Sequence, residues 1–333
     1  MAHHNGPVSA VGDNLVLDRA VINAVAKESE VVSAERYGNS AWASTARITT
    51  RDSHGTTHEY FVKVVKGEHA EQRVLGEYSS MSELYKTMPS IVPTPRAFGP
   101  CLDSGGYFFL CDYLEIDHRP PDAEKLAQKI AELHQTSVSP TRQFGFHVTT
   151  YDGKLPLDVG WEDSWVLFYT KLLQGVYKHD LEVNGLWKEL DDAMAITLDK
   201  IIPRLLSPLE EDGRSVKPCL IHGDLWEENI GTDSRTGDIY IFDSCSYYAH
   251  HEMAIGMWRV DHHHMKAKKY QNAYFKLFKP DEPMEEWEDR NCLYAIKERL
   301  MYSAHVPGSK ARAQALDDMN YLIDKYVKQQ ENT

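Results

Sequence analysis

Two β-rich segments near the start of the chain constrain the fold more than any other feature of the sequence. They read AWASTARITTRD (residues 41–52) and THEYFVKVVKG (57–67), and the polar stretch SHGT, which contains Gly55, separates them. Runs of β-branched and aromatic residues on either side of a short glycine-containing turn are typical of a β-hairpin. We therefore expect an antiparallel sheet in the first third of the chain.

Helical spacing dominates the rest of the sequence. A loop punctuated by prolines (89–100) leads to an apolar strand (105–115), and two short strands interrupt the helical pattern within residues 219–243. Asp122 is the expected N-cap of the helix that begins beside it. Helices are predicted over residues 15–29, 69–88, 121–137, 164–180, 187–206, 289–304 and 315–328.

The order of these elements predicts an α+β protein with two lobes. A chain of 333 residues is long enough for two lobes that each bury a core. We place a small N-terminal β lobe with one main helix at residues 1–113. The larger lobe, at residues 114–333, is expected to be mainly helical.

The overall charge limits the classes of partner. Asp and Glu outnumber Lys and Arg by 50 to 36, which gives a formal net charge of -14. Such a chain has little attraction for a nucleic-acid backbone or an anionic membrane surface. We therefore expect neither nucleic acid nor membrane as a partner, and we expect a monomer or a weak dimer.

The cysteines and the first residues indicate a cytoplasmic protein. The five cysteines are widely spaced and form no Cys-x-x-Cys pair, as is typical of reduced thiols rather than of a disulfide framework. Residues 1–14 lack an apolar signal core. No run approaches the roughly 18 apolar residues that span a bilayer.

The segment LIHGDLWEENIG (220–231) carries the residues with the clearest chemistry. Asp224 and Asn229 follow the end of an apolar run, and a second apolar run, IYIFD, ends at Asp243. Phosphoryl transfer needs a carboxylate for the acceptor proton, oxygen ligands for Mg²⁺ and a cation on the phosphates. Because Mg²⁺ usually takes only one or two carboxylates, Asn229 and Asp243 suit the metal. Asp224 is then left to face the acceptor.

The cation for the phosphates is expected on the β lobe. Lys63 lies in the strand-like segment EYFVKVV, where it can reach the nucleotide. A buried lysine needs a carboxylate partner. We predict that this partner is Glu77 on the next helix, with Glu71 and Glu83 as alternatives on the same helix.

The stretch FFLCDYLE is interpreted as the hinge between the lobes. Backbone N–H and C=O groups around Asp112, Tyr113 and Leu114 are predicted to bind the adenine edge of ATP. In this interpretation the first lobe binds the nucleotide, and the second lobe carries the catalytic loop and the substrate site.

The combined pattern resembles the fructosamine kinase (ketosamine-3-kinase) family, which is related to aminoglycoside phosphotransferases and choline kinases. The family pattern is His-Gly-Asp-Leu-Trp-x-x-Asn, followed by Ile-Asp-Pro-Ala-x-Tyr-Tyr-Gly-x-x-Glu. Similar segments also surround Lys63 and cover residues 126–134, 144–146 and 161–173. The residues that match the pattern are His222, Gly223, Asp224, Leu225, Trp226, Asn229, Asp243, Tyr247, Tyr248 and Glu252.

The resemblance implies a protein-kinase-like fold and an enzyme that uses ATP and Mg²⁺. By this likeness Asp224 is the catalytic base, and Asn229 and Asp243 hold the metal. Lys63 and Glu77 form the pair that positions the phosphates. Enzymes of the family phosphorylate the 3-hydroxyl of the sugar in ketosamines such as fructoselysine. The unstable product then falls away, which deglycates the amine of a small molecule or of a protein.

The sequence departs from the family pattern at several positions. Ser244-Cys245 replaces Pro-Ala, Ala254 replaces an acidic residue, and Glu227-Glu228 replaces small residues. The stretch 38–45 has a single glycine, so no Gly-rich phosphate loop is evident. Two alternatives therefore stay open. One is a kinase of the same fold for an aminoglycoside, choline or another sugar, and the other is a nucleotide-binding pseudokinase.

Three further features have both a structural and a functional interpretation. Trp226 either packs in the core or forms a wall for the sugar of the acceptor. The run DHHHM (261–265) is expected to be solvated, because neighbouring residues on a helix diverge around its axis and cannot share one metal. Cys245 is expected to be a small buried thiol.

Overall fold

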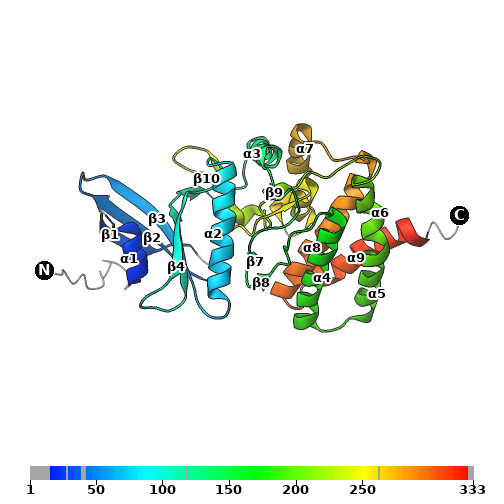
Figure 1. Cartoon of the computed structure of the whole chain (residues 1–333), viewed down its shortest axis with the longest axis horizontal. Coiled ribbons are helices and arrows are strands. Elements are labelled where there is room, and N and C mark those ends of the chain that lie inside the picture. Colours follow the sequence, from blue (N-terminus) through cyan, green and yellow to red (C-terminus); the bar gives the residue numbers. More distant parts are fainter. Residues whose placement is uncertain (1–15, 28, 39–42, 118, 262, 329–333) are drawn as a thin grey trace.

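The computed structural model describes residues 16–27, 29–38, 43–117, 119–261 and 263–328 (Figure 1). A sheet with two helices forms the N-terminal end of the molecule, and most of the other helices gather at the opposite end. The α+β class expected from the sequence is confirmed.

Five antiparallel strands form the N-terminal sheet in the order β1-β2-β3-β5-β4. The predicted hairpin consists of β2 and β3, whose pairing runs from Ser44↔Val64 to Arg51↔Thr57. The predicted helix after the hairpin is α2 (Ala70–Thr87). The strands are β1 (Ser29–Arg36), β2 (Ser44–Asp52), β3 (Thr57–Val65), β4 (Pro95–Pro100) and β5 (Tyr107–Asp112).

The pleat of β5 divides its side chains between two cores. Phe108 and Leu110 belong to a small core that includes residues of helix α1 (Arg19–Val25). Phe109 and Cys111, which alternate with them, belong to the main core together with residues of α2. Because successive side chains of a strand point to opposite faces, the sheet has α1 on one face and α2 on the other.

Two predictions for this part of the chain are correct only in part. The helix expected over residues 15–29 is shorter in the described part of the chain, because α1 ends at Val25 and the strand β1 begins at Ser29. The proline-punctuated stretch is irregular over residues 89–94 as expected, but its second half is the edge strand β4, with Pro95 and Pro100 at its two ends. An edge strand pairs with one neighbour only, so it tolerates residues that lack an N–H.

The predicted helices of the C-terminal part are present, and α7 occurs in addition. Asp122 caps α3 as expected, because its carboxylate accepts the N–H groups of Glu124 and Lys125. Helix α8 is buried on almost every side and lies among the other helices (Figure 1). The helices are α3 (Ala123–Thr136), α4 (Trp165–Asn184), α5 (Lys188–Ile196), α6 (Ile202–Leu206), α7 (Lys268–Leu277), α8 (Trp287–His305) and α9 (Ala311–Ile323).

Short strands frame the segment that carries the His-Gly-Asp motif. One pair consists of β9 (Cys219–Ile221) and β12 (Tyr247–Ala249). The other consists of β10 (Ile230–Asp233) and β11 (Ile239–Ile241), and β10 also pairs with β6 (Ile116–Asp117). These pairings fold the chain back on itself, so that the loop after β9 and the loop after β11 meet.

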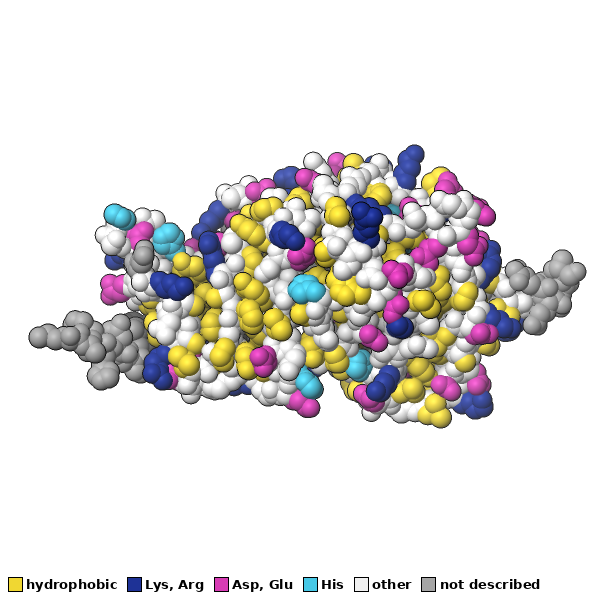
Figure 2. All heavy atoms as spheres, in the orientation of Figure 1, with side chains coloured by type: hydrophobic (Ala, Val, Ile, Leu, Met, Phe, Trp, Pro, Cys, Tyr) yellow, Lys and Arg dark blue, Asp and Glu magenta, His cyan; other side chains and the backbone are white. Residues whose placement is uncertain are grey.

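Among the described residues, no helix combines the length and the apolar character that a bilayer crossing requires. On the face shown in Figure 2, acidic and basic side chains are interspersed. The net charge of -14 therefore does not gather into one patch on that face.

Candidate active site

A cavity of about 1080 Å³ lies between the N-terminal sheet and the helical part of the chain. Strands β3 and β5 and helix α2 contribute to one wall, and the loops after β9 and β11 and helix α8 contribute to the other. All nine residues that the sequence predicted for the site line this cavity. They are Lys63, Glu77, Asp112, Tyr113, Leu114, Asp224, Trp226, Asn229 and Asp243.

The Lys63 ammonium lies between two carboxylates. Its Nζ is 3.0 Å from Glu77 Oε2 on α2 and 3.2 Å from Asp243 Oδ1 after β11. Burial lowers the pKa of Lys63, but the charges of Asp243 and Glu77 raise it by more, and the net pKa is above the ordinary value. The ammonium therefore stays charged inside the cavity.

Glu77 is the carboxylate of α2 that reaches this lysine. Glu71 is exposed, and Glu83 accepts a hydrogen bond from the Tyr248 hydroxyl at 2.9 Å. Burial raises the pKa of Glu77, Lys63 opposes this shift and Asp243 adds to it, and the resulting pKa is about 7. A cation that neutralised Asp243 would therefore favour the ionised form of Glu77.

His222 and Gly223 join the two loops that carry the acidic residues. His222 Nε2 donates to the Phe242 carbonyl at 2.9 Å, and His222 Nδ1 accepts the N–H of Asp224 at 3.3 Å. Burial lowers the pKa of His222 to about 4, so the ring is neutral at pH 7. Gly223 has a φ of 87°, and a Cβ there would lie 2.4 Å from the Cys245 carbonyl oxygen. Only glycine permits such a close approach without displacement of the neighbouring loop.

Asn229 orients the carboxylate of Asp224. A 3₁₀ turn (η3, Glu227–Asn229) brings the two residues together. Asn229 Nδ2 donates to the Asp224 carbonyl at 2.9 Å and to Asp224 Oδ2 at 2.8 Å. Because the amide N–H groups point to Asp224, the amide oxygen of Asn229 is the atom that can face a cation.

Asp243 has an unusual backbone conformation. Its φ of 56° lies in the left-handed region, where Asp and Asn are several-fold enriched among residues other than glycine. Burial raises the pKa of Asp243, but Lys63, Glu77 and His222 together lower it by more, so the carboxylate is ionised at neutral pH. Such backbone outliers cluster at functional sites, and this one presents a charged oxygen ligand to the cavity.

The sequence matches a family model over most of its length. Residues 20–327 match the model described as fructosamine kinase. The chain belongs to the fructosamine kinase family. Its match covers both the N-terminal sheet and the helical part, so the expected resemblance is confirmed.

Curated relatives of this family member are named as kinases. A chloroplastic protein-ribulosamine 3-kinase from Oryza sativa subsp. japonica is 28% identical over 270 residues, which cover 81% of this chain and 72% of the relative. A ketosamine-3-kinase from Mus musculus is 29% identical, and the alignment covers 79% of this chain and 87% of the relative.

Solved structures show the same fold. A candidate fructosamine-3-kinase from Thermobifida fusca superposes with a TM-score of 0.72 at 19% identity, covering 92% of this chain and 98% of that chain. A thermostable mutant of the aminoglycoside phosphotransferase APH(4)-Ia gives a TM-score of 0.61 at 14% identity, covering 93% and 99%. The fold of this fructosamine kinase family member is therefore protein-kinase-like, as predicted.

Several departures from the fructosamine kinase pattern are packed inside the molecule. Ser244 and Cys245 are buried, and burial raises the pKa of the Cys245 thiol well above its ordinary value. The thiol is thus a buried, protonated group, in agreement with the prediction. Ala254 is buried in the 3₁₀ turn η4 (His251–Ile255). Residues 39–42 of the single-glycine stretch lie outside the described residues.

Glu227, another departure, connects the motif to the histidine run. Glu227 Oε1 accepts the N–H of His264 at 2.9 Å, and Glu227 Oε2 is 3.5 Å from His263 Nδ1. His263 is only 7% exposed, although His264 is exposed. The prediction that the run 261–265 is solvated is therefore wrong for His263, because the Glu227 carboxylate offers it a buried partner. His262 lies outside the described residues.

Trp226 occupies a position that fits both of its interpretations. It is partly buried against the main core, and it also lines the cavity. Its ring centroid is 5.4 Å from that of His263. The two rings together form an aromatic part of the cavity wall close to Asp224.

Charged groups that the sequence did not reveal also line the cavity. Asp152 on β7 (Tyr151–Asp152) accepts a hydrogen bond from His305 Nε2 at 3.0 Å, and Glu298 Oε2 is 3.0 Å from Lys297 Nζ. Burial, and then the charges of Asp152 and Glu298, raise the pKa of Asp224 well above its ordinary value. No pattern in the sequence marks these residues, because Lys297 and Glu298 are themselves buried inside helix α8.

The hinge residues follow the expected position at the end of β5, but two of their N–H groups are already engaged. The Asp112 N–H donates to the Thr94 carbonyl and the Tyr113 N–H donates to the Glu59 carbonyl, each at 3.0 Å. Leu114 comes next and lines the cavity. The backbone of Leu114 and the hinge carbonyls are thus the groups that an adenine edge can meet.

Proposed function

We propose that this member of the fructosamine kinase family transfers the γ-phosphoryl group of ATP to a sugar hydroxyl of a ketosamine, the 3-hydroxyl in the family pattern. The observation that carries the proposal is one cavity in which a lysine held by two carboxylates faces a hydrogen-bonded Asp–Asn pair. The names of the rice and mouse relatives support an acceptor of the ketosamine type. Such a reaction would deglycate the amine.

Asp224 has the role of the base that takes the proton of the acceptor hydroxyl. Its raised pKa makes it a stronger proton acceptor than an ordinary carboxylate. The hydrogen bond from Asn229 fixes Asp224 Oδ2, so Oδ1 is the oxygen left for the hydroxyl. An acceptor that carries a positive charge would lower the pKa of Asp224 as it binds and so keep the carboxylate ionised.

Lys63 and the metal ligands act on the phosphates. Lys63 neutralises phosphate charge, and Glu77 holds its ammonium at the cavity wall. The amide oxygen of Asn229 and the ionised carboxylate of Asp243 fit Mg²⁺, which prefers oxygen ligands and takes few carboxylates. Mg²⁺, when bound, neutralises charge that develops on the transferred group.

The charge around Asp224 supports an acceptor with an amine. A ketosamine carries a protonatable nitrogen close to its sugar hydroxyls, and Asp152 and Glu298 add negative charge beside Asp224 that Lys297 offsets in part. Trp226 offers a flat apolar surface for the sugar ring. These two features together favour an amine-bearing sugar over a neutral sugar.

The proposal also covers the division of the chain into lobes, the compartment and the oligomeric state. The lobe boundary is placed between residues 113 and 114, next to the end of β5 at Asp112, with the nucleotide on the first lobe and the acceptor on the second. We infer a cytoplasmic monomer or weak dimer that binds neither nucleic acid nor membrane. The acidic net charge of -14 supports this inference.

The variant Asp224→Asn tests the proposed chemistry with ATP, Mg²⁺ and a fructosyl-lysine acceptor. Because a positioned general base contributes roughly 10²- to 10⁴-fold, we expect kcat to fall by that amount with an unchanged Tm. Asp238→Asn, at an exposed position, is the matched control and should keep the parent rate. Undiminished phosphate transfer by Asp224→Asn would contradict the assignment of Asp224 as the base.

A panel of acceptors separates the proposed substrate class from its alternatives. Phosphate should appear on ketosamines and not on choline, an aminoglycoside or an amine-free sugar. Transfer to one of those molecules in place of ketosamines contradicts the acceptor class. ATP binding without transfer to any acceptor would indicate a pseudokinase.

A further inference from the structure

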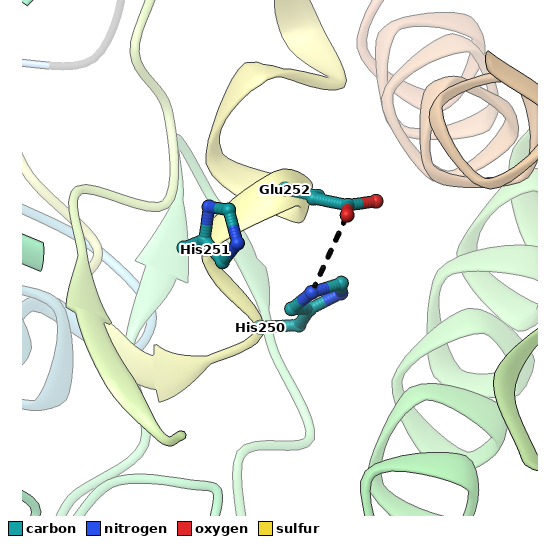
Figure 3. Close-up of side chains that lie close together, drawn as sticks. All are labelled: His250, His251 and Glu252. Atoms are coloured by element: carbon teal, nitrogen blue, oxygen red, sulfur yellow. Dashed lines mark ion pairs between the residues drawn. The ribbon is translucent and has the colours of Figure 1, made fainter. Parts of the chain in front are cut away.

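A second group of ionisable side chains is buried outside the active-site cavity. His250, His251 and Glu252 lie at the start of η4, and Asp281 lies in the loop after α7. The first three are each at most 2% exposed, whereas the Asp281 side chain is 39% exposed. Figure 3 shows the two imidazole rings and the Glu252 carboxylate close together. None of these four residues lines the active-site cavity.

One carboxylate oxygen of Asp281 lies close to a nitrogen of each imidazole ring. His250 Nε2 is 3.1 Å and His251 Nε2 is 3.9 Å from the same atom, Asp281 Oδ2. One ligand atom from each of His250, His251 and Glu252 falls within 4.8 Å of the others. A tetrahedral Zn²⁺ with bonds of about 2.0–2.1 Å needs ligand atoms about 3.3–3.4 Å apart. The distances from the two imidazole nitrogens to Asp281 Oδ2, 3.1 Å and 3.9 Å, lie on either side of that value.

The other nitrogen of each imidazole has a buried tyrosine as its partner. His250 Nδ1 is 2.8 Å from the Tyr294 hydroxyl, and His251 Nδ1 is 3.0 Å from the Tyr274 hydroxyl. The His251 ring is also stacked on Phe278, with centroids 4.0 Å apart. Histidines that bind metals almost always have the second nitrogen hydrogen-bonded in this way, because the bond fixes the ring and its tautomer.

His251 Nε2 is the atom that the protein alone does not satisfy. It is buried and has no hydrogen-bond partner among the described residues. A buried nitrogen without a partner is unfavourable, because it has lost its hydrogen bonds to water and gained none in return. An imidazole nitrogen without a hydrogen-bond partner is available to bind a metal ion.

We propose that His250 Nε2, His251 Nε2 and Asp281 Oδ2 bind a divalent transition-metal ion of the Zn²⁺ type, with water as the fourth ligand. Two imidazole nitrogens and one carboxylate in a tetrahedral arrangement are a typical ligand set for Zn²⁺. The exposed side of Asp281 provides the route for the ion and the place for the water.

Glu252 supports this site without binding the metal. Its Oε1 accepts hydrogen bonds from Arg290 Nη2 and from the Asp281 N–H, and its Oε2 accepts one from Arg290 Nε. Glu252 therefore neutralises Arg290, which leaves Asp281 as the charge for the ion. The bound metal would tie η4 to the loop that precedes α8.

Binding of Zn²⁺ alone, without ATP, tests the proposal. All proteins carry Asp243→Asn, which weakens metal binding at the active site, and calorimetry measures the affinity. The parent in this test, which carries Asp243→Asn alone, should bind about one Zn²⁺ per chain. Adding Asp281→Asn should weaken this binding by at least about 10-fold. Adding Tyr274→Phe, which removes the hydroxyl beside His251 Nδ1, should weaken it by about 10- to 100-fold. Asp238→Asn is the control and should leave it unchanged.

Thermal unfolding provides the second measurement. Zn²⁺ should raise the Tm of the parent and of the control, but not that of the Asp281→Asn protein, since a ligand stabilises only the fold that binds it. Equal Zn²⁺ affinity in the parent and in Asp281→Asn would overturn the proposal. So would a parent that binds no Zn²⁺, and the group would then be a hydrogen-bonded network only.

Discussion

Replacement of Glu77 by glutamine tests the carboxylate that holds the phosphate-binding lysine. Two unit charges at the observed 3.0 Å attract each other by about 5–6 kcal/mol at an effective dielectric constant of about 20. Much of this attraction is not lost, because Lys63 keeps Asp243 at 3.2 Å and because a buried charge is removed. We expect a net loss of about 2 kcal/mol in transition-state stabilisation, or about 30-fold in kcat/KM for ATP.

The assay for Glu77→Gln is steady-state phosphate transfer at several Mg²⁺ concentrations. The lysine should move toward Asp243 when its other partner is neutral, so the variant should need more Mg²⁺ for half-maximal rate. Glu83→Gln and Glu71→Gln are matched controls on the same helix, since Glu83 bonds to a tyrosine and Glu71 is exposed. The reasoning is refuted if all three variants lose the same activity.

Further predictions concern the aromatic part of the cavity wall formed by Trp226 and His263, the catalytic loop and the stability of the protein in acid. Glu227→Ala should raise the acceptor KM by about 10-fold with little change in the KM for ATP, because it removes a charged hydrogen bond of about 1.5–3 kcal/mol, whereas Glu227→Gln keeps that bond. An unchanged acceptor KM in both variants contradicts the role of this wall. In urea unfolding, the Gly223→Ala variant should lose more free energy of unfolding than the Gly237→Ala variant. Both glycines have a positive φ, which costs a residue with a Cβ about 1–3 kcal/mol. Only at position 223 would the new Cβ also clash with backbone atoms. Equal losses would contradict the clash. Burial raises the pKa of Asp18, but hydrogen bonds from four backbone N–H groups lower it by more, to below its usual range. Its stabilising contribution is therefore present above pH about 3.9 and is lost as the pH falls below that value. The stability gap between parent and Asp18→Asn should then narrow in acid-unfolding curves, and a constant gap would disprove this origin.

The residues around the phosphates could be predicted because local chemistry marks them. Asp224 and Asn229 lie in one short motif, and strand pairing brings the end of β11 to the same place. The partner of Lys63 could only be narrowed to three carboxylates of one helix. The choice among them depends on how α2 is rotated against β3, which tertiary packing decides.

The acceptor side could not be read from the sequence for a different physical reason. Asp152 belongs to a strand of two residues, and Glu298 lies inside a helix that is buried on nearly all sides, so neither follows a period or a spacing. The burial of His263 depends on Glu227, which lies outside its own segment. The edge strand β4 was missed because its prolines are also typical of loops.

Gly223 packs closely against the loop after β11. This contact joins the groups that transfer the phosphoryl group into one unit, apart from the groups that select the acceptor. The backbone of the base and that of the metal-ligand loop are locked together through His222 and Cys245, so they move as one unit. Asp152 and Glu298 come from other elements and take no part in these contacts. A change in the unit should slow phosphorylation of every acceptor in parallel. A change in the surrounding wall can instead reorder acceptors, so a lineage could acquire a new substrate while it keeps its phosphate chemistry intact.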